Sequence, residues 1–221
     1  MNLQPQHIDA IREIVNIGIG RAAGMLNEML KSHVELQVPS IKIFSHKDLE
    51  KELGVLCQEK LSCIRMQFKG PFSGVALLIF PPDSASELVD LLIDEIPEQH
   101  DLDSIRIGTL TEVGNIVLNG VMGSIGNILD KKISYSVPSY LEDTISKSIS
   151  SNTPCPDSVI MLVRAYLNIK KHMIKGEIII LFEVGYFDAL IEEIESSFHQ
   201  ISDQNKSSFC STVEDELKLK R

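Results

Sequence analysis

The chain carries one pattern of polar residues twice, inside apolar and helix-like segments, at an offset of 99 residues. Each copy has a Glu, an Asn three positions later, then a Gly and finally a Pro. The matched pairs are Glu13 with Glu112, Asn16 with Asn115, Gly24 with Gly123 and Pro39 with Pro138. A repeat of this kind indicates a chain built from two similar halves, each contributing the same structural elements.

Both halves predict the same order of elements, namely a helix, three strands and a second helix. Gly-containing turns such as KGPFSG and KKHMIKG separate the later strands of each half. The predicted strands cover residues 35–44, 61–69, 74–80, 133–139, 158–169 and 175–184. Short connections make consecutive strands antiparallel. We therefore expect an α+β protein, internally duplicated, whose antiparallel sheet is flanked by long helices with pseudo-two-fold symmetry.

The repeat also predicts the domain organisation. Residues 1–200 are expected to form one domain made of two repeats, about 1–98 and 99–200. Residues 141–156 are rich in Ser, Thr and Pro and are predicted to form a mobile loop between strands. Residues 201–221 are mostly polar and charged, which predicts a flexible tail.

Composition and charge exclude several classes of function. The net charge is −10 and no basic stripe is visible, so a nucleic-acid partner is not expected. The N-terminus has no signal-peptide pattern, and the most apolar runs are too short to cross a bilayer. These features predict a cytoplasmic protein without membrane insertion. The four cysteines and six histidines show no metal-ligand spacing, so no metal or other cofactor held by this chain is expected.

The first copy of the pattern places polar residues along one side of a predicted helix. Asp9, Glu13 and Asn16 stand at i, i+4 and i+7 and share a face. The opposite, buried face is predicted to contain Ile11, Ile14, Val15, Gly18, Ala22, Met25 and Leu26. In the second copy, the buried face is predicted to contain Leu110, Val113, Val117, Val121 and Ile125. A single Glu–Asn pair is typical of a solvent-facing helix, but two copies at one offset favour a function.

The full pattern is Asp or Ser, three residues, Glu, two residues, Asn, 22 residues and Pro. It resembles the signature of the CheC/CheX/FliY family of chemotaxis phosphatases, and the two copies resemble its CheC-type, two-centre members most. The first copy is complete in Asp9, Glu13, Asn16 and Pro39. The second copy departs from the signature at Gly108, where Asp or Ser is expected. The resemblance extends over the chain to about residue 195.

The resemblance implies an activity and a role for each residue. It implies a phosphatase that hydrolyses the phospho-aspartate of a CheY-like response regulator. Asn16 and Asn115 would orient the attacking water, as a Gln does in small GTPases. Glu13 and Glu112 would bind the lysine of the receiver domain. Asp9 would support the start of its helix, Pro39 and Pro138 would fix the path of the following strand, and Mg²⁺ is expected on the partner receiver domain.

Two other interpretations stay open at this point. A non-catalytic protein could use the same surfaces to bind a phosphorylated receiver domain or a CheD-like deamidase. Alternatively, the same chemistry could act on a response regulator outside chemotaxis. The Gly-rich run GIGRAAG lacks the remainder of a P-loop and lies within a helical pattern, and no nucleophile elbow occurs. These absences disfavour nucleotide-binding and serine-hydrolase functions.

Overall fold

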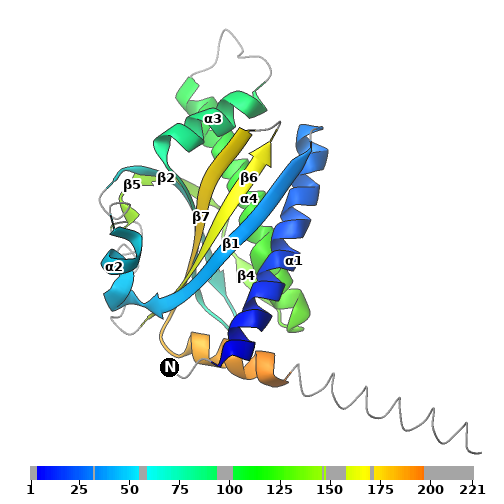
Figure 1. Cartoon of the computed structure of the whole chain (residues 1–221), viewed down its shortest axis with the longest axis vertical. Helices are drawn as coiled ribbons and strands as arrows, with labels where there is room; N and C mark the ends of the chain where they lie inside the picture. The colour runs from blue at the N-terminus through cyan, green and yellow to red at the C-terminus, as the bar shows by residue number, and fades with distance from the viewer. Residues whose placement is uncertain are drawn as a thin grey trace, which may run out of the picture.

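The computed structural model describes residues 4–31, 33–54, 59–93, 102–145, 147, 158–169 and 172–196 (Figure 1). The predicted tail, residues 201–221, and most of the predicted loop lie outside these residues. The described helices are α1 (Pro5–Leu30), α2 (Leu49–Leu53), α3 (Pro82–Leu92), α4 (Leu102–Ile128), residues 186–196 and the 3-10 helix η1 (His46–Asp48). No helix in the described ranges is both long and apolar enough to traverse a lipid bilayer.

One sheet of seven strands forms the centre of the fold, and within the described residues its strands pair antiparallel. Its order is β1-β6-β7-β3-β2-β4, with β5 also paired to β2. The strands are β1 (Val34–Ser45), β2 (Leu61–Lys69), β3 (Gly74–Phe80), β4 (Ser134–Tyr135), β5 (Ser139–Asp143), β6 (Val159–Ile169) and β7 (His172–Phe182). This arrangement confirms the predicted α+β class and the antiparallel sheet.

The strand pairing reproduces the internal repeat as a two-fold arrangement. The central pair joins the third strand of each half, β3 and β7. Outside it, β1 of the first half pairs with β6 of the second, and β5 of the second half pairs with β2 of the first. Ser40 lies opposite Arg164, and Arg65 lies opposite Ser139, which are the same two positions at the repeat offset. The halves therefore exchange strands and share one sheet.

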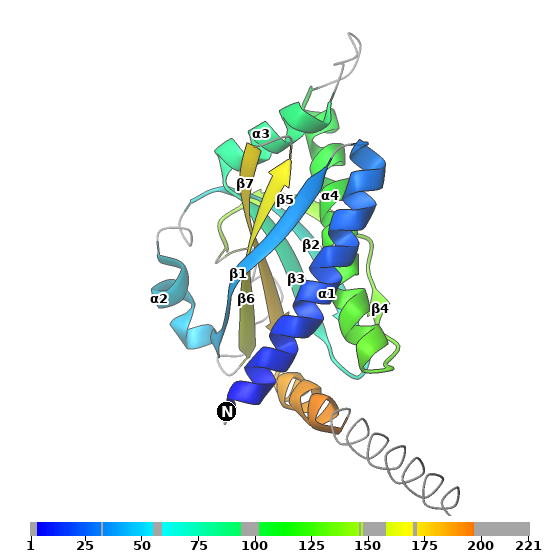
Figure 2. The same cartoon turned by 45° about the vertical axis from the view of Figure 1, so that its right-hand side comes forward.

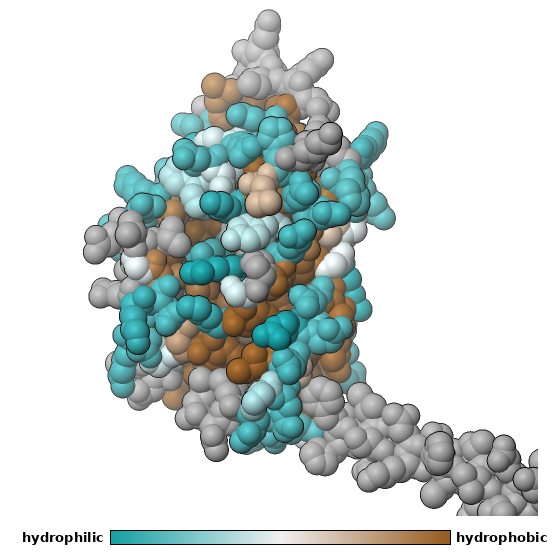
Figure 3. Space-filling model, viewed as in Figure 1, coloured by the Kyte–Doolittle hydropathy of each residue, from teal (hydrophilic) through white to brown (hydrophobic). Residues whose placement is uncertain are grey.

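The two long helices lie side by side on one face of the sheet and run in opposite directions (Figures 1 and 2). Their buried side chains join the sheet residues that alternate toward this face, such as Ile64, Met66 and Phe68 of β2, in the larger core. The other face carries a smaller core around Leu77 and Ile179. Figure 3, in the orientation of Figure 1 with β1 toward the viewer, shows apolar side chains interspersed with hydrophilic ones. The long helices therefore have one side against the sheet and one side toward solvent.

Each repeated proline lies at an irregularity of its strand rather than at the exit from a helix. On β1, Gln37 lies opposite Tyr166 and Ser40 lies opposite Arg164, so β1 has one extra residue between them. Pro39 falls within this bulge. Proline has no backbone N–H to donate to a neighbouring strand, so a bulge is a position that tolerates it.

The second proline occupies the matching irregularity. Phe68 of β2 lies opposite Tyr135 of β4, and Arg65 lies opposite Ser139 of β5, so the β4–β5 segment also has one extra residue. Pro138 lies in the interval between β4 and β5. The two prolines, predicted to fix the path of the following strand, therefore both lie where a strand changes register.

Other differences from the sequence prediction concern the second half. The strand predicted at residues 133–139 is divided into β4 and β5 by this bulge, and Leu141–Asp143, predicted as loop, belong to β5. Residues 172–174, predicted to lie in the turn before this strand, are the first part of β7. The elements η1 and α2 were not predicted, because the segment between β1 and β2 is short and polar.

Candidate functional site

The first Glu–Asn pair lies on the exposed ridge of α1. Asp9, Glu13 and Asn16 are all solvent-exposed, whereas Ile14 and Val15 between them are buried. The predicted buried face is confirmed at all positions except Met25, which is 51% exposed. The 3.6-residue period therefore divides this helix into a core side and an open polar side.

Within the described part of the chain, the Glu13 carboxylate and the Asn16 amide form no hydrogen bond or ion pair with another side chain. Asp9 instead forms an ion pair with Arg12, with Nη1 and Oδ1 2.9 Å apart. Asp9 was predicted to support the start of its helix, but α1 begins four residues earlier, at Pro5, with Gln4 in the N-cap position. The first pair is therefore free to contact another molecule.

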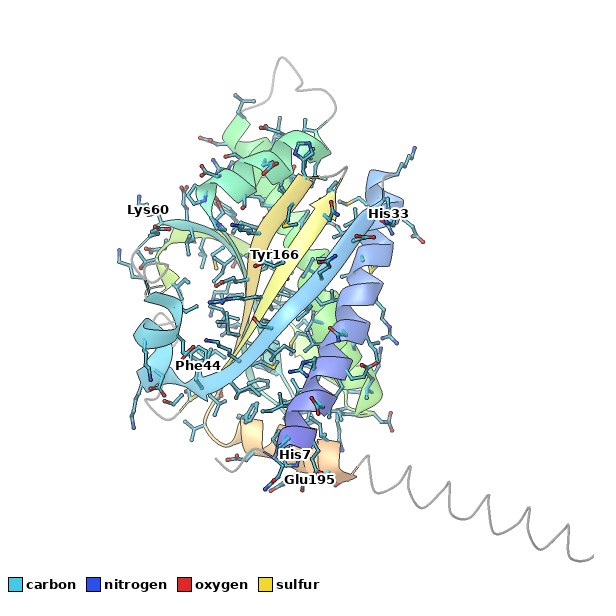
Figure 4. All side chains as sticks on the ribbon, in the orientation of Figure 1. His7, His33, Phe44, Lys60, Tyr166 and Glu195 are labelled. Carbon is cyan, nitrogen blue, oxygen red and sulfur yellow. The ribbon has the colours of Figure 1, made fainter. Side chains whose placement is uncertain are left out.

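The start of α1 is anchored by a contact with the helix at residues 186–196. Nε2 of buried His7 lies 2.8 Å from Oε1 of Glu195 (Figure 4). Nδ1 of His7 accepts a hydrogen bond from the backbone N–H of Gln4 at 3.3 Å. Because His7 is six residues before Glu13, this contact fixes the turns that lead to the first pair.

The second pair lies on α4 and has different surroundings. Glu112 is exposed, but Asn115 is half-buried, and its Oδ1 accepts a hydrogen bond from Nδ2 of Asn119 at 2.6 Å. Gly108, at the position of Asp9, is exposed and offers no side chain. Thr111 does not replace the missing group, because its hydroxyl donates to the carbonyl of Ile107 in its own helix at 2.6 Å.

The long helices place both pairs on the side of the molecule that faces away from the sheet. The helices cross at Gly18 and Gly120, where an added Cβ on either glycine would overlap the backbone of the other helix. Asn16 precedes the crossing point by two residues on α1, and Asn115 precedes it by five on α4. Because the helices are antiparallel, the two Asn residues lie on opposite sides of the crossing and the offsets add. At a rise of 1.5 Å per residue, the two Asn residues are about 10 Å apart along the axes. The structure thus presents two separate Glu–Asn ridges rather than one combined site.

A cavity of about 230 Å³ lies elsewhere, on the sheet face opposite the long helices. Arg164 and Glu177 line it and form an ion pair, with Nε and Oε1 3.3 Å apart. Burial raises the pKa of the Glu177 carboxyl above its ordinary value, and Arg164 opposes this shift only in part. None of the predicted site residues lines this cavity. Among the residues that the structure describes, no cluster of His, Cys, Asp or Glu could hold a metal ion.

Asn119 contacts the second pair directly but was not among the predicted site residues. The sequence feature that could have indicated Asn119 is its spacing of four residues from Asn115, because side chains four residues apart on a helix are neighbours. The first copy has Gly20 at the matching position, so the internal comparison did not mark Asn119 as part of the pattern.

Comparison with known proteins by sequence gives two relevant similarities. The profile of the CheC-like family matches residues 7–43, which include the complete first pattern. The curated protein CheY-P phosphatase CheC of Bacillus subtilis is 25% identical over 122 residues. That match includes 52% of this chain and 56% of the relative, so the chain spans little more than half of the relative's length.

Solved structures show the same fold over nearly the whole chain. FliY of Thermotoga maritima has a TM-score of 0.68 at 19% identity, with 90% of this chain and 99% of FliY covered. FliM from Helicobacter pylori, in a complex with SpeE, has a TM-score of 0.67 at 13% identity, with 89% and 98% covered. Together, the fold, the CheC-like profile match and the similarity to CheC support the resemblance of this chain to the CheC/CheX/FliY family.

Proposed function

We propose that this protein is a phosphatase that hydrolyses the phospho-aspartate of a CheY-like response regulator. The observation that carries the proposal is the duplicated Glu–Asn pair on the outward sides of α1 and α4. The similarity to a protein named CheY-P phosphatase CheC supports the same activity for this chain. The phosphoryl group belongs to another protein, so residues on exposed ridges can reach it where residues in a closed cavity could not.

The proposed reaction is the attack of water on phosphorus, with cleavage of the bond between phosphorus and the aspartate oxygen. The aspartate carboxylate leaves, and inorganic phosphate is released. Positioning and charge stabilisation supply most of the catalysis in such a transfer. The amide of Asn16 or Asn115 both donates and accepts hydrogen bonds and would hold the water in line with the breaking bond. Positioning of this kind contributes several kcal/mol to a rate enhancement, up to about 7–11 in favourable cases.

The paired carboxylates have a different role in this proposal. Glu13 and Glu112 would each form a charge-assisted hydrogen bond with the lysine of a receiver domain. This contact would align the helix so that the Asn three residues later reaches the phosphoryl group. The receiver domain would supply Mg²⁺, whose charge stabilises the oxygens of the transferred group.

A binding function without catalysis is the second candidate. Ile17 and Met25 on α1 are apolar side chains exposed to 37% and 51%. Exposed apolar groups beside a polar ridge favour protein docking. In this case the ridges would hold a phosphorylated receiver domain or a CheD-like deamidase and would protect the phosphoryl group or leave its lifetime unchanged.

Release of phosphate from a phosphorylated receiver domain tests the two candidates. The wild-type protein should accelerate release, and Asn16→Ala with Asn115→Ala should abolish the acceleration without loss of folding. Each single substitution should retain part of the activity, whereas Asn127→Ala, an exposed change on α4, should retain all of it. A double variant with the wild-type rate would refute the assignment, and a wild-type protein that slows phosphate release would support the binding function.

A further inference from the structure

The side-chain contacts of the two Asn residues differ because of the position four residues after each Asn. In the second pair this position is Asn119, whose Nδ2 donates to Oδ1 of Asn115 at 2.6 Å. In the first pair it is Gly20, which has no side chain and where an added Cβ would meet nothing within 4 Å. The amide of Asn115 is therefore held by its own helix, and the amide of Asn16 is not.

This contact determines which end of the Asn115 amide is held. A side-chain amide has a donor end and an acceptor end, and rotation about its last bond exchanges them. Asn119 donates to the oxygen end, which fixes the rotation. A carbonyl oxygen has two lone pairs, so Oδ1 can accept from Asn119 and from a water at the same time. Donation to this oxygen therefore leaves its second lone pair available to orient a water.

The degree of burial agrees with this difference between the pairs. Asn115 and Asn119 are both half-buried, whereas Asn16 is exposed. A side chain that is already restrained loses less conformational freedom when a partner binds. The second pair consequently meets its partner in a more ordered state than the first.

We propose that Asn119 is a positioning residue for the second centre, which holds the Asn115 amide in the rotation that orients the attacking water. This inference rests on the proposed phosphatase function. It assigns unequal roles to the two centres: the second is organised in advance, and the first is ordered only by the bound receiver domain.

The test isolates the second centre with Asn16→Ala and then changes Asn119. Asn119→Ala removes the donor, and kcat should fall about tenfold with KM unchanged, because a misoriented water affects the reaction and not the docking. Asn119→Asp keeps nearly the same shape but provides only acceptors at neutral pH. It would attract the nitrogen end of Asn115 and turn the oxygen away, so kcat should fall at least as far.

The matched control places the same two substitutions in Asn115→Ala, where only the first centre works. There, neither Asn119→Ala nor Asn119→Asp should change kcat, because the residue they position is absent. Equal losses in both backgrounds would show a general structural effect and overturn the inference. Unchanged kcat in the Asn16→Ala background would also overturn it.

The failure of the inference can be distinguished from failure of the proposed function. The variant Asn16→Ala/Asn115→Ala lacks both proposed water-orienting groups. If this variant is inactive while Asn119 has no influence, the phosphatase proposal survives and the role of Asn119 is rejected. If it retains the wild-type rate, the phosphatase assignment itself is rejected, and the positioning role with it.

Discussion

Gly18 of α1 and Gly120 of α4 meet through their backbones, in a reciprocal contact. A Cβ added at Gly18 would lie 2.8 Å from the carbonyl oxygen of Gly120, and one added at Gly120 would lie 2.9 Å from that of Gly18. Neither position therefore has room for a side chain. This close approach sets the distance between the two helices and hence between the two Glu–Asn pairs.

The crossing predicts opposite effects for two glycines of the same helix. Gly18→Ala should destabilise the protein by about 1–3 kcal/mol, because the new methyl group would overlap the backbone of Val121. Gly24→Ala should stabilise it by up to about 1 kcal/mol, because Cβ there meets nothing within 4 Å and Ala favours helix. Urea denaturation of both variants measures the difference, and equal effects would contradict the described crossing.

The bulge in β1 predicts that deletion of Pro39 is far more harmful than its substitution. Deletion removes the extra residue, so residues 34–37 must either lose their pairing with β6 or turn their side chains to the opposite face. Buried Val34 would then leave the core, at a cost of about 1.5–3 kcal/mol for the side chain alone. Pro39→Ala keeps the residue count and should change the free energy of unfolding by less than about 1 kcal/mol. Thermal denaturation compares them, and similar losses would argue against the bulge.

Glu177 predicts a pH dependence of stability. Because burial raises its pKa, the folded protein binds this proton more tightly than the unfolded chain does. The free energy of unfolding therefore falls as pH rises from the unfolded pKa to the folded pKa, and then levels. Glu177→Gln cannot titrate and should lack this decline, so the variant should gain stability relative to wild type as pH rises above about 4. Urea denaturation across this range measures the gain.

Glu52 is the matched control, because its pKa shifts in the other direction. Lys42 donates to Oε2 of Glu52 at 2.6 Å and lowers the pKa of that carboxyl. The contribution of Glu52 to the free energy of unfolding is therefore complete above the pKa of the unfolded chain, and it is lost as pH falls through the lower pKa of the folded protein. Glu52→Gln should therefore lose stability relative to wild type as pH rises through this interval. If both variants changed in stability in the same direction relative to wild type as pH rises, the opposite pKa shifts of Glu177 and Glu52 would be contradicted.

The sequence allowed accurate prediction of elements whose signals are local. The boundaries of β2 and β3 agree with prediction at every residue, because Gly and charged residues limit two apolar runs. The faces of α1 and α4 also follow from periodicity. Met25 is the exception, since it points outward although its position fits the buried pattern.

Features that depend on pairing between the halves were beyond sequence prediction. The division of β4 from β5 arises from the register against β2, which is 65 or more residues earlier. The contact between Asn115 and Asn119 is local, but Asn at i and i+4 is compatible with many side-chain orientations. The internal repeat guided the choice of Glu13, Asn16, Glu112 and Asn115, and could not indicate a residue found in only one copy.

The proposed docking role of the carboxylates predicts a specific change in kinetics. Glu13→Gln with Glu112→Gln removes both charges while keeping the side-chain size. A charge-assisted hydrogen bond contributes about 1.5–3 kcal/mol, so KM for the phosphorylated receiver domain should rise at least about tenfold. The value of kcat should change little, because the water-orienting Asn residues remain. Glu28→Gln, an exposed change on the same helix, should leave KM unchanged.

Ionic strength provides a second measurement for this prediction. Salt screens exposed charges, so the difference in KM between wild type and the double Gln variant should shrink as salt rises toward about 1 M, where the Debye length is about 3 Å. Glu28→Gln should match wild type at every salt concentration. If the double variant instead lowers kcat at constant KM, the carboxylates act in the reaction rather than in docking, and their assignment to the lysine of the receiver domain is wrong.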